Sequence, residues 1–162
     1  MKKEFKEPEI KLIKGVEVKD LKVFPDERGR LIEIFRDDDE LFIKFGQAYV
    51  TTAYPGVVKA WHLHEKQTDH IVCVHGMIKL VLYDVRGESP TLDVLNEFYL
   101  GVHHPILVKV PPLVYHGFKG VSVEEAIVVN IPDAHYDYKK PDEFRLDAYN
   151  EKINYDWRRK DR

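Results

Sequence analysis

The chain has 162 residues, of which 44% are hydrophobic and 33% are charged, and its formal net charge is -3. This balance is typical of an ordinary soluble globular protein and argues against a disordered chain or two separate domains. Lysines and arginines are scattered among nearly as many acids, which disfavours nucleic acid as a partner, and no stretch is long and apolar enough to cross a membrane.

Most of the chain between residues 16 and 131 is expected to form short β-strands. β-Branched and aromatic residues gather in brief runs that Gly, Pro, Asp and Ser interrupt, which is the pattern of an all-β protein. The run at 77–83 alternates imperfectly, as in a strand with one face in a barrel and the other against a second sheet. The predicted strands are residues 15–24, 31–35, 47–54, 57–63, 70–75, 77–84, 96–100, 106–110 and 125–131.

Two segments depart from this pattern. Residues 37–45 begin with four acids and then turn apolar, which predicts a short helix. Residues 132–162 are rich in Tyr, Asp, Lys and Pro, and we expect their part at 141–157 to wrap onto the barrel as a tail with one helical turn. The sequence thus predicts a single domain over residues 1–162, with its core at about 15–131 and no internal repeat or linker.

Two features bear on the compartment. Residues 1–8 carry charge but lack the apolar stretch of a secretory signal, so we expect a cytoplasmic protein. The single cysteine, Cys73, lies in an apolar run and cannot form an internal disulfide. It is therefore predicted to be a small buried side chain and not a reactive thiol.

Histidines form the densest chemical pattern. Alternate residues of a strand share a face, so His62 and His64 are expected to point the same way, with Leu63 on the other side. A second cluster places His116 shortly after the rigid turn Pro111-Pro112, where a barrel mouth is expected. The three imidazoles are therefore predicted to converge on one cavity.

The alternative interpretation is that these histidines are structural groups bonded to neighbouring carbonyls. For one isolated histidine that interpretation is the better one, but the paired spacing and the second cluster favour a site. The remaining histidines have no such pattern and are assigned structural or surface roles: His70, His75, His103, His104 and His135.

The chain resembles the dTDP-4-dehydrorhamnose 3,5-epimerases and their relatives in the cupin superfamily. The resemblance runs through nearly the whole chain, and the motifs are specific only when taken together. It implies a homodimer of cupin double-stranded β-helix (jelly-roll) barrels, with short helical segments and a C-terminal tail. The motifs that carry it are Asp26-Glu27-Arg28-Gly29 with Glu33, Gln47, Pro55-Gly56-Val57 with His62, Asp84-Val85-Arg86 with Ser89-Pro90-Thr91, Pro111-Pro112, His116-Gly117-Phe118 and Asp156-Trp157.

The resemblance implies an isomerase that epimerises a nucleotide-linked 4-keto-6-deoxy sugar in deoxysugar or polysaccharide biosynthesis, without a cofactor. The ketone acidifies the flanking C–H bonds, so a base can remove one proton and an acid can return one on the opposite face. His62 matches the family's base, and Asp147 or Asn150 falls near the aspartate that orients it. The remaining matches imply substrate-binding roles for Arg28, Glu33, Gln47, Lys59, Asp69 and His116.

Three positions depart from the family's pattern. Lys59 stands where a phosphate-binding arginine is usual, and keeps the charge without the bidentate fork. Asp69 replaces the lysine that steadies the enolate, and Val129 replaces the tyrosine that acts as acid. Tyr136 is the expected substitute for that tyrosine, with Tyr138 and Tyr83 as other candidate phenols.

Two other functions fit the same residues. His62, His64, Asp69 and His116 are similar to the metal-binding motif of other cupins, and would suit one divalent transition metal that polarises a carbonyl. A metal on His62 is incompatible with that ring acting as base, because a ligated nitrogen cannot also take a proton. The remaining possibility is a sugar-binding cupin without catalysis.

Overall fold

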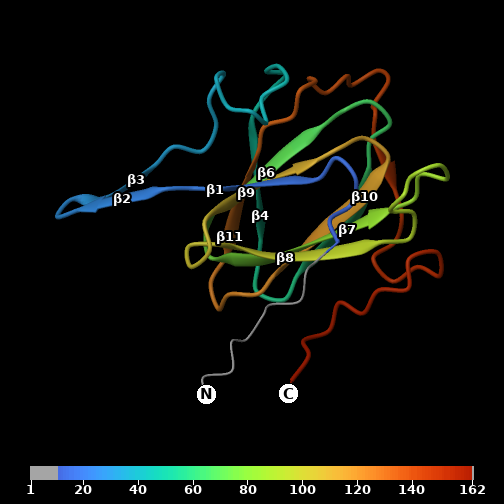
Figure 1. The fold of residues 1–162 in the computed structure, drawn as a ribbon. Coiled ribbons are helices and arrows are strands. Elements are labelled where there is room, and N and C mark those ends of the chain that lie inside the picture. Colours follow the sequence, from blue (N-terminus) through green and yellow to red (C-terminus); the bar gives the residue numbers. More distant parts are fainter. Residues whose placement is uncertain (1–10, 162) are drawn as a thin grey trace, which may run out of the picture.

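The computed structural model describes residues 11–161. Its strands form two antiparallel five-stranded sheets and a separate hairpin (Figure 1). The first sheet has the order β1-β9-β6-β11-β4 and the second has the order β12-β5-β10-β7-β8. The strands are β1 Glu17–Asp20, β2 Val23–Asp26, β3 Gly29–Ile32, β4 Tyr49–Ala53, β5 Val58–Leu63, β6 Asp69–His75, β7 Met77–Asp84, β8 Leu95–Gly101, β9 Ile106–Val110, β10 Val114–Gly120, β11 Ala126–Asn130 and β12 Phe144–Arg145.

The predicted all-β jelly roll is confirmed, but its helical segments are wrong. No helix of any kind, membrane-spanning or shorter, is found within residues 11–161. The segment 37–45 folds as turns instead, because the Asp39 carboxylate accepts bonds from Lys19 and from the backbone of Arg36. Leu41 is then buried in an apolar cluster with Val72 and Leu107. The predicted domain boundaries at 1–162 reach beyond the described residues and stay a prediction.

The strand β7 shows why its alternation is imperfect. Ile78, Leu80 and Leu82 point into the core between the sheets, while Val81 packs on the outside against Trp157. Both faces are therefore buried, as predicted. The outer layer is not a second sheet, however, but the C-terminal tail.

Two strands escaped prediction. The strand β10 contains Gly117 and Gly120, which weaken strand propensity. Gly117 is nevertheless required, because a Cβ at that position would lie 2.3 Å from the Cβ of Ala60 on β5. The two-residue β12 forms only because the tail pairs with β5, where Phe144 lies opposite Leu63. Neither cause can be read from local sequence.

The tail is attached to the outer face of the second sheet. Leu146 exchanges two backbone hydrogen bonds with Trp61, at 2.9 and 3.1 Å. Trp61, Ile153 and Trp157 are each no more than 2% exposed and form one apolar cluster. The expected packing of the tail on the barrel is thus observed, and it brings residues 142–146 to the mouth of the barrel.

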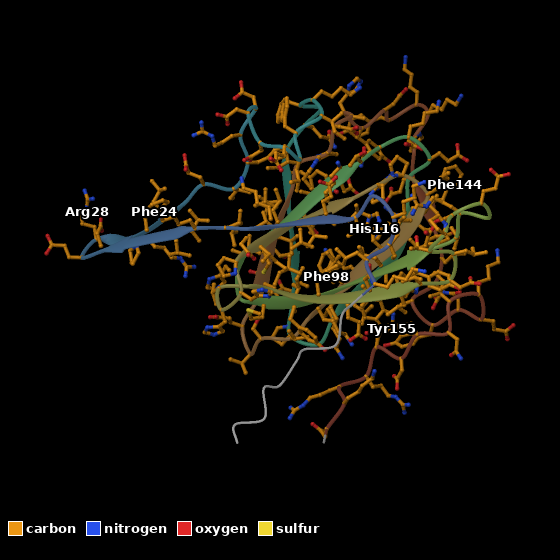
Figure 2. All side chains as sticks on the ribbon, viewed as in Figure 1. Phe24, Arg28, Phe98, His116, Phe144 and Tyr155 are labelled. Carbon is orange, nitrogen blue, oxygen red and sulfur yellow. The ribbon has the colours of Figure 1, made fainter. Side chains whose placement is uncertain are left out.

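The hairpin of β2 and β3 projects away from the barrel (Figure 1). Arg28 and Phe24 lie on it, far from His116 (Figure 2). Phe24 and Leu31 are apolar residues that remain 43% and 59% exposed. The hairpin therefore presents an uncovered apolar surface within a single chain.

Candidate active site

A cavity of about 730 Å³ lies between the two sheets at the end where the tail passes. Its walls come from β4, β5, β10 and β11 and from the segments at 136–138 and 143–146. The lining residues include Gln47, Tyr49, Lys59, His62, His64, Gln67, His116, Asn130, Tyr136 and Glu143.

The three histidines meet as the strand alternation and the Pro111-Pro112 turn together predicted. His62 lies directly opposite His116 in the register of β5 and β10, and their ring centroids are 6.1 Å apart. The ring centroids of His64 and His116 are 5.5 Å apart. All three rings border the same cavity, as expected from the sequence.

His62 is held by one carboxylate. Its Nδ1 lies 2.9 Å from Oε1 of Glu143, and among residues 11–161 nothing bonds to its Nε2. Burial lowers the pKa of His62, as does the nearby His116, and the bond to Glu143 opposes them. A neutral ring that donates Nδ1–H to Glu143 leaves the Nε2 lone pair free, which is the state that a general base requires.

The orienting carboxylate is therefore Glu143, and the expectation for Asp147 is wrong. Asp147 is exposed and accepts a bond from the backbone of Tyr149, while Asn150 bonds to backbone groups of the tail. The backbone pairing of Arg145 with His62 fixes which tail residue faces the ring. An acidic pair, Asp142-Glu143, after Pro141 was the only sequence signal for this role.

Asp142 fixes the loop that follows β5. Its carboxylate accepts the backbone N–H groups of Glu65, Lys66 and Gln67 at 2.9 to 3.1 Å. Its backbone carbonyl accepts the Nδ1–H of His64. The tail thus positions two of the site histidines through consecutive residues.

Asp69 joins the two sheets behind the cavity. It is 1% exposed, and its Oδ2 lies 3.3 Å from Nε2 of His64 and 3.2 Å from Nε2 of His116. Its Oδ1 accepts amide bonds from Gln67 and Asn130. With these partners, Asp69 acts on the cavity through the imidazoles and does not border it.

Charge in this cluster follows from the contacts. Burial would raise the pKa of Asp69, but hydrogen bonds from His116 and His64 hold that pKa well below its usual range. Burial would lower the pKa of His64, but the bond to Asp69 and its charge raise that pKa to about 9. His64 is therefore an imidazolium at neutral pH, and both its N–H groups are donated to acceptors.

The cluster around Asp69 also has the residue types of a metal site. One ligand atom each from His64, Asp69 and His116 lies within 4.8 Å of the others, so these three fit a divalent transition metal. His62 does not belong to this set, because the ligand atoms that lie this close together come only from the other three residues. The four-residue ligand set expected from the sequence is reduced to three.

The other substrate-binding residues expected from the sequence either border the cavity or lie far from it. Lys59 borders the cavity with its Nζ 3.0 Å from the hydroxyl of Thr51, and Gln47 accepts the backbone N–H of Tyr136. Arg28 and Glu33 are instead remote from the cavity, paired with Asp26 and Arg36. Within one chain the structure does not bring these two residues to the site.

Of the three tyrosines expected as candidate acids, two border the cavity and one does not. Tyr136 and Tyr138 border the cavity and contact each other with ring centroids 5.0 Å apart, although Tyr138 is 89% exposed. Tyr83 lies outside the barrel and donates to Asp93. Sequence reasoning missed Tyr49, although the polar alternation of Gln47, Tyr49 and Thr51 was a readable signal for one shared face.

Comparison with known proteins gives consistent matches. The family model described as dTDP-4-dehydrorhamnose 3,5-epimerase matches residues 11–162. A probable low-salt glycan biosynthesis epimerase of Haloferax volcanii is 44% identical, over 90% of this chain and 94% of the relative. A spore coat polysaccharide biosynthesis protein of Bacillus subtilis is 37% identical, over 90% and 97%. The crystal structure of a dTDP sugar isomerase from Desulfovibrio desulfuricans is 30% identical, over 90% and 92%, with a TM-score of 0.85.

Proposed function

Since the chain belongs to the dTDP-4-dehydrorhamnose 3,5-epimerase family, as its motifs predicted, we propose that it epimerises a nucleotide-linked 4-keto-6-deoxy sugar by removing a proton next to the ketone. The observation that carries the proposal is the state of His62. Glu143 holds one ring nitrogen, and the other is open to a cavity large enough for a sugar.

The reaction begins when Nε2 of His62 takes the proton from a carbon beside the ketone. Negative charge then develops on the carbonyl oxygen, and a cationic wall stabilises it. The imidazolium of His64, fixed by Asp69, supplies positive charge in the region where the family has a lysine. Asp69 thus serves the substrate through the charge that it maintains on His64, and His116 borders the same cavity.

We assign substrate binding to the lysine and the side-chain amide that border the cavity, Lys59 and Gln47. Lys59, on β5, borders the cavity and reaches the hydroxyl of Thr51 on β4, and it is the contact that we propose for the diphosphate. Gln47 faces the same space and also anchors the segment that carries Tyr136. Tyr136 remains a predicted acid, and no cofactor is needed for this chemistry.

Arg28 and Glu33 keep their proposed substrate-binding roles only if they act in another copy's cavity. The projecting hairpin carries them together with the exposed apolar residues Phe24 and Leu31, whose burial would favour association. We therefore propose a homodimer in which each hairpin reaches the partner's site. The apolar surface supports this arrangement because a lone chain leaves it uncovered.

Mixing two impaired variants tests the homodimer, at a substrate concentration too low for Arg28→Ala to bind measurably. The variants Arg28→Ala and His62→Ala are mixed in equal amounts, dissociated and allowed to reassociate. If Arg28 acts across the interface, each hybrid dimer contains one complete site. About a quarter of wild-type activity then returns, as random pairing requires. No recovery in hybrids shown by mass spectrometry to have formed would mean that Arg28 acts in its own chain or nowhere.

The relatives give the biological setting. One is a probable epimerase of glycan biosynthesis and one is a spore coat polysaccharide biosynthesis protein. We propose that this chain likewise serves polysaccharide biosynthesis, in the cytoplasm, where nucleotide sugars are made.

A second candidate, a metal-dependent cupin enzyme, is favoured by the cluster of His64, Asp69 and His116. When bound there, a divalent transition metal would supply Lewis-acid polarisation of a carbonyl. Protein purified without a histidine tag decides between the two. Metal near one equivalent would support this candidate, and trace amounts would support the ion-pair interpretation of the cluster.

Proton exchange tests the main proposal. Incubation with a dTDP-4-keto-6-deoxyhexose in deuterated water should place deuterium on at least one carbon beside the ketone, as read by NMR. His62→Ala should lose this exchange while nucleotide-sugar binding is mostly kept, and Arg28→Ala should chiefly weaken binding. Absence of deuterium with the wild-type protein would leave the non-catalytic, sugar-binding function.

A further inference from the structure

One phenol in the cavity is fixed by a chain of hydrogen bonds. Tyr49 lies on β4 directly opposite Asn130 on β11, and its hydroxyl oxygen is 2.9 Å from Nδ2 of Asn130. The other partner of that Nδ2 is Oδ1 of Asp69, also at 2.9 Å. Both amide hydrogens of Asn130 are therefore in use.

The direction of these bonds is determined by the neighbours. Oδ1 of Asn130 accepts the backbone N–H of His70 at 3.1 Å, so the amide cannot be turned over without losing that bond. Asp69 as a carboxylate can only accept. The oxygen of Tyr49 must then accept from Asn130, and its own hydrogen is left to point into the cavity.

The surroundings keep this phenol protonated. Burial and the charge of Asp69 raise the pKa of Tyr49, and Glu143 acts in the same direction. The bond from Asn130 opposes them and would stabilise the oxygen once it has lost its proton. A neutral phenol with a fixed donor behind its oxygen is a suitable proton donor.

Tyr49 and His62 belong to different walls of the cavity. Tyr49 lies on β4 in the first sheet and His62 on β5 in the second, and both border the space between. Inversion at carbon requires a base on one side of the sugar ring and an acid on the other. Residues on different walls of the cavity can act from opposite sides of a sugar bound between them.

The position matched to the family's tyrosine cannot supply this acid. The side chain of Val129 packs on the outer face of the first sheet, in the cluster with Val72 and Leu107. Its neighbours Val128 and Asn130 are the ones that face the cavity. A phenol must come from another position, and Tyr49 lies on β4, which pairs with β11 at this point.

On these grounds we infer that Tyr49 is the catalytic acid of this epimerase, an inference that rests on the proposed function. His62 takes the proton, and the C–H electron pair forms the enolate. The enolate carbon then bonds to the phenol proton on the opposite face, and the carbonyl re-forms. The phenolate regains a proton from water and the imidazolium loses one to water, so the reaction is a net isomerisation.

Three tyrosine variants test the assignment with a dTDP-4-keto-6-deoxyhexose in deuterated water. In Tyr49→Phe, His62 can still remove a proton and return deuterium on the same face. We therefore expect deuterium in the unchanged substrate at a rate within about threefold of wild type, whereas epimer formation falls by about 100-fold or more. Tyr83→Phe is the matched control, because it removes a phenol that lies outside the barrel, and should behave as wild type.

Tyr136→Phe tests the phenol that the sequence led us to expect as the acid. Loss of inversion in that variant alone, or epimerisation within threefold of wild type by Tyr49→Phe, would overturn the role of Tyr49 and leave the proposed function intact. A wild-type protein that neither exchanges nor epimerises would overturn the proposed function and the inference together. Matching melting temperatures show that the variants are folded.

Discussion

Replacing Glu143 by Ala removes the only described contact that orients His62. The bond between Oε1 and Nδ1 is 2.9 Å long, and the two side chains are 17% and 27% exposed. Arg145 contacts both oxygens of the carboxylate, at 3.0 and 2.9 Å, and so keeps it in place beside the ring. Without Glu143, the ring is free to rotate and to place its proton on Nε2.

The size of the effect follows from this single bond. A hydrogen bond to a charged group contributes about 1.5 to 3 kcal/mol. If the bond stabilises only the correctly oriented ring, its loss lowers kcat by about 10- to 150-fold, at tenfold for each 1.4 kcal/mol. Glu143→Gln keeps an acceptor without the charge and should lie between Ala and wild type.

Deuterium incorporation beside the ketone gives kcat, and equilibrium binding of the nucleotide sugar gives Kd. We expect the loss in kcat with Kd nearly unchanged, because Glu143 acts through His62. Asp147→Ala is the control and should match wild type. The reasoning is refuted if Glu143→Ala keeps kcat within threefold, or if Asp147→Ala loses as much.

Three further predictions concern stability and reactivity. Trp157→Ala removes a fully buried ring that attaches the tail to Trp61, and should lower the free energy of unfolding by about 3 to 5 kcal/mol in urea titration; a loss under 1 kcal/mol would contradict this packing role. Burial would raise the pKa of Asp84, but hydrogen bonds from Arg86, Ser89 and Thr91 hold that pKa well below its usual range. The carboxylate therefore stabilises the fold above about pH 4, and this contribution is lost as the pH falls further. Asp84→Asn should therefore cost about 3 kcal/mol at pH 7 and less at pH 3, and an equal cost at both would be inconsistent with a charge effect. Burial raises the pKa of Cys73 to about 11. Iodoacetamide should therefore modify the native thiol at least about 100-fold more slowly than the urea-unfolded thiol, as followed by mass spectrometry. Comparable rates would exclude a buried thiol.

Local sequence determined most of the strands and the shared face of His62 and His64. Period-two patterns depend only on neighbouring residues, so β7 was predicted with the observed bounds and His62 and His64 were placed on one face. His116 was expected at the same cavity from the turn at Pro111-Pro112, although its strand was not predicted. The family was readable for a related reason, since its motifs are short and lie in order along the chain. The helix predicted at 37–45 failed because its acids are used in tertiary contacts, through Lys19 and Asp39.

Tertiary structure alone decided which polar groups serve the histidines. Glu143 reaches His62 from 81 residues away, and Asn130 reaches Tyr49 across the same separation, so neither pairing leaves a local pattern. Both depend on the register between strands and on where the tail crosses the barrel mouth. A shift of one residue would turn the opposite set of side chains toward the site, and only the packed chain fixes that choice.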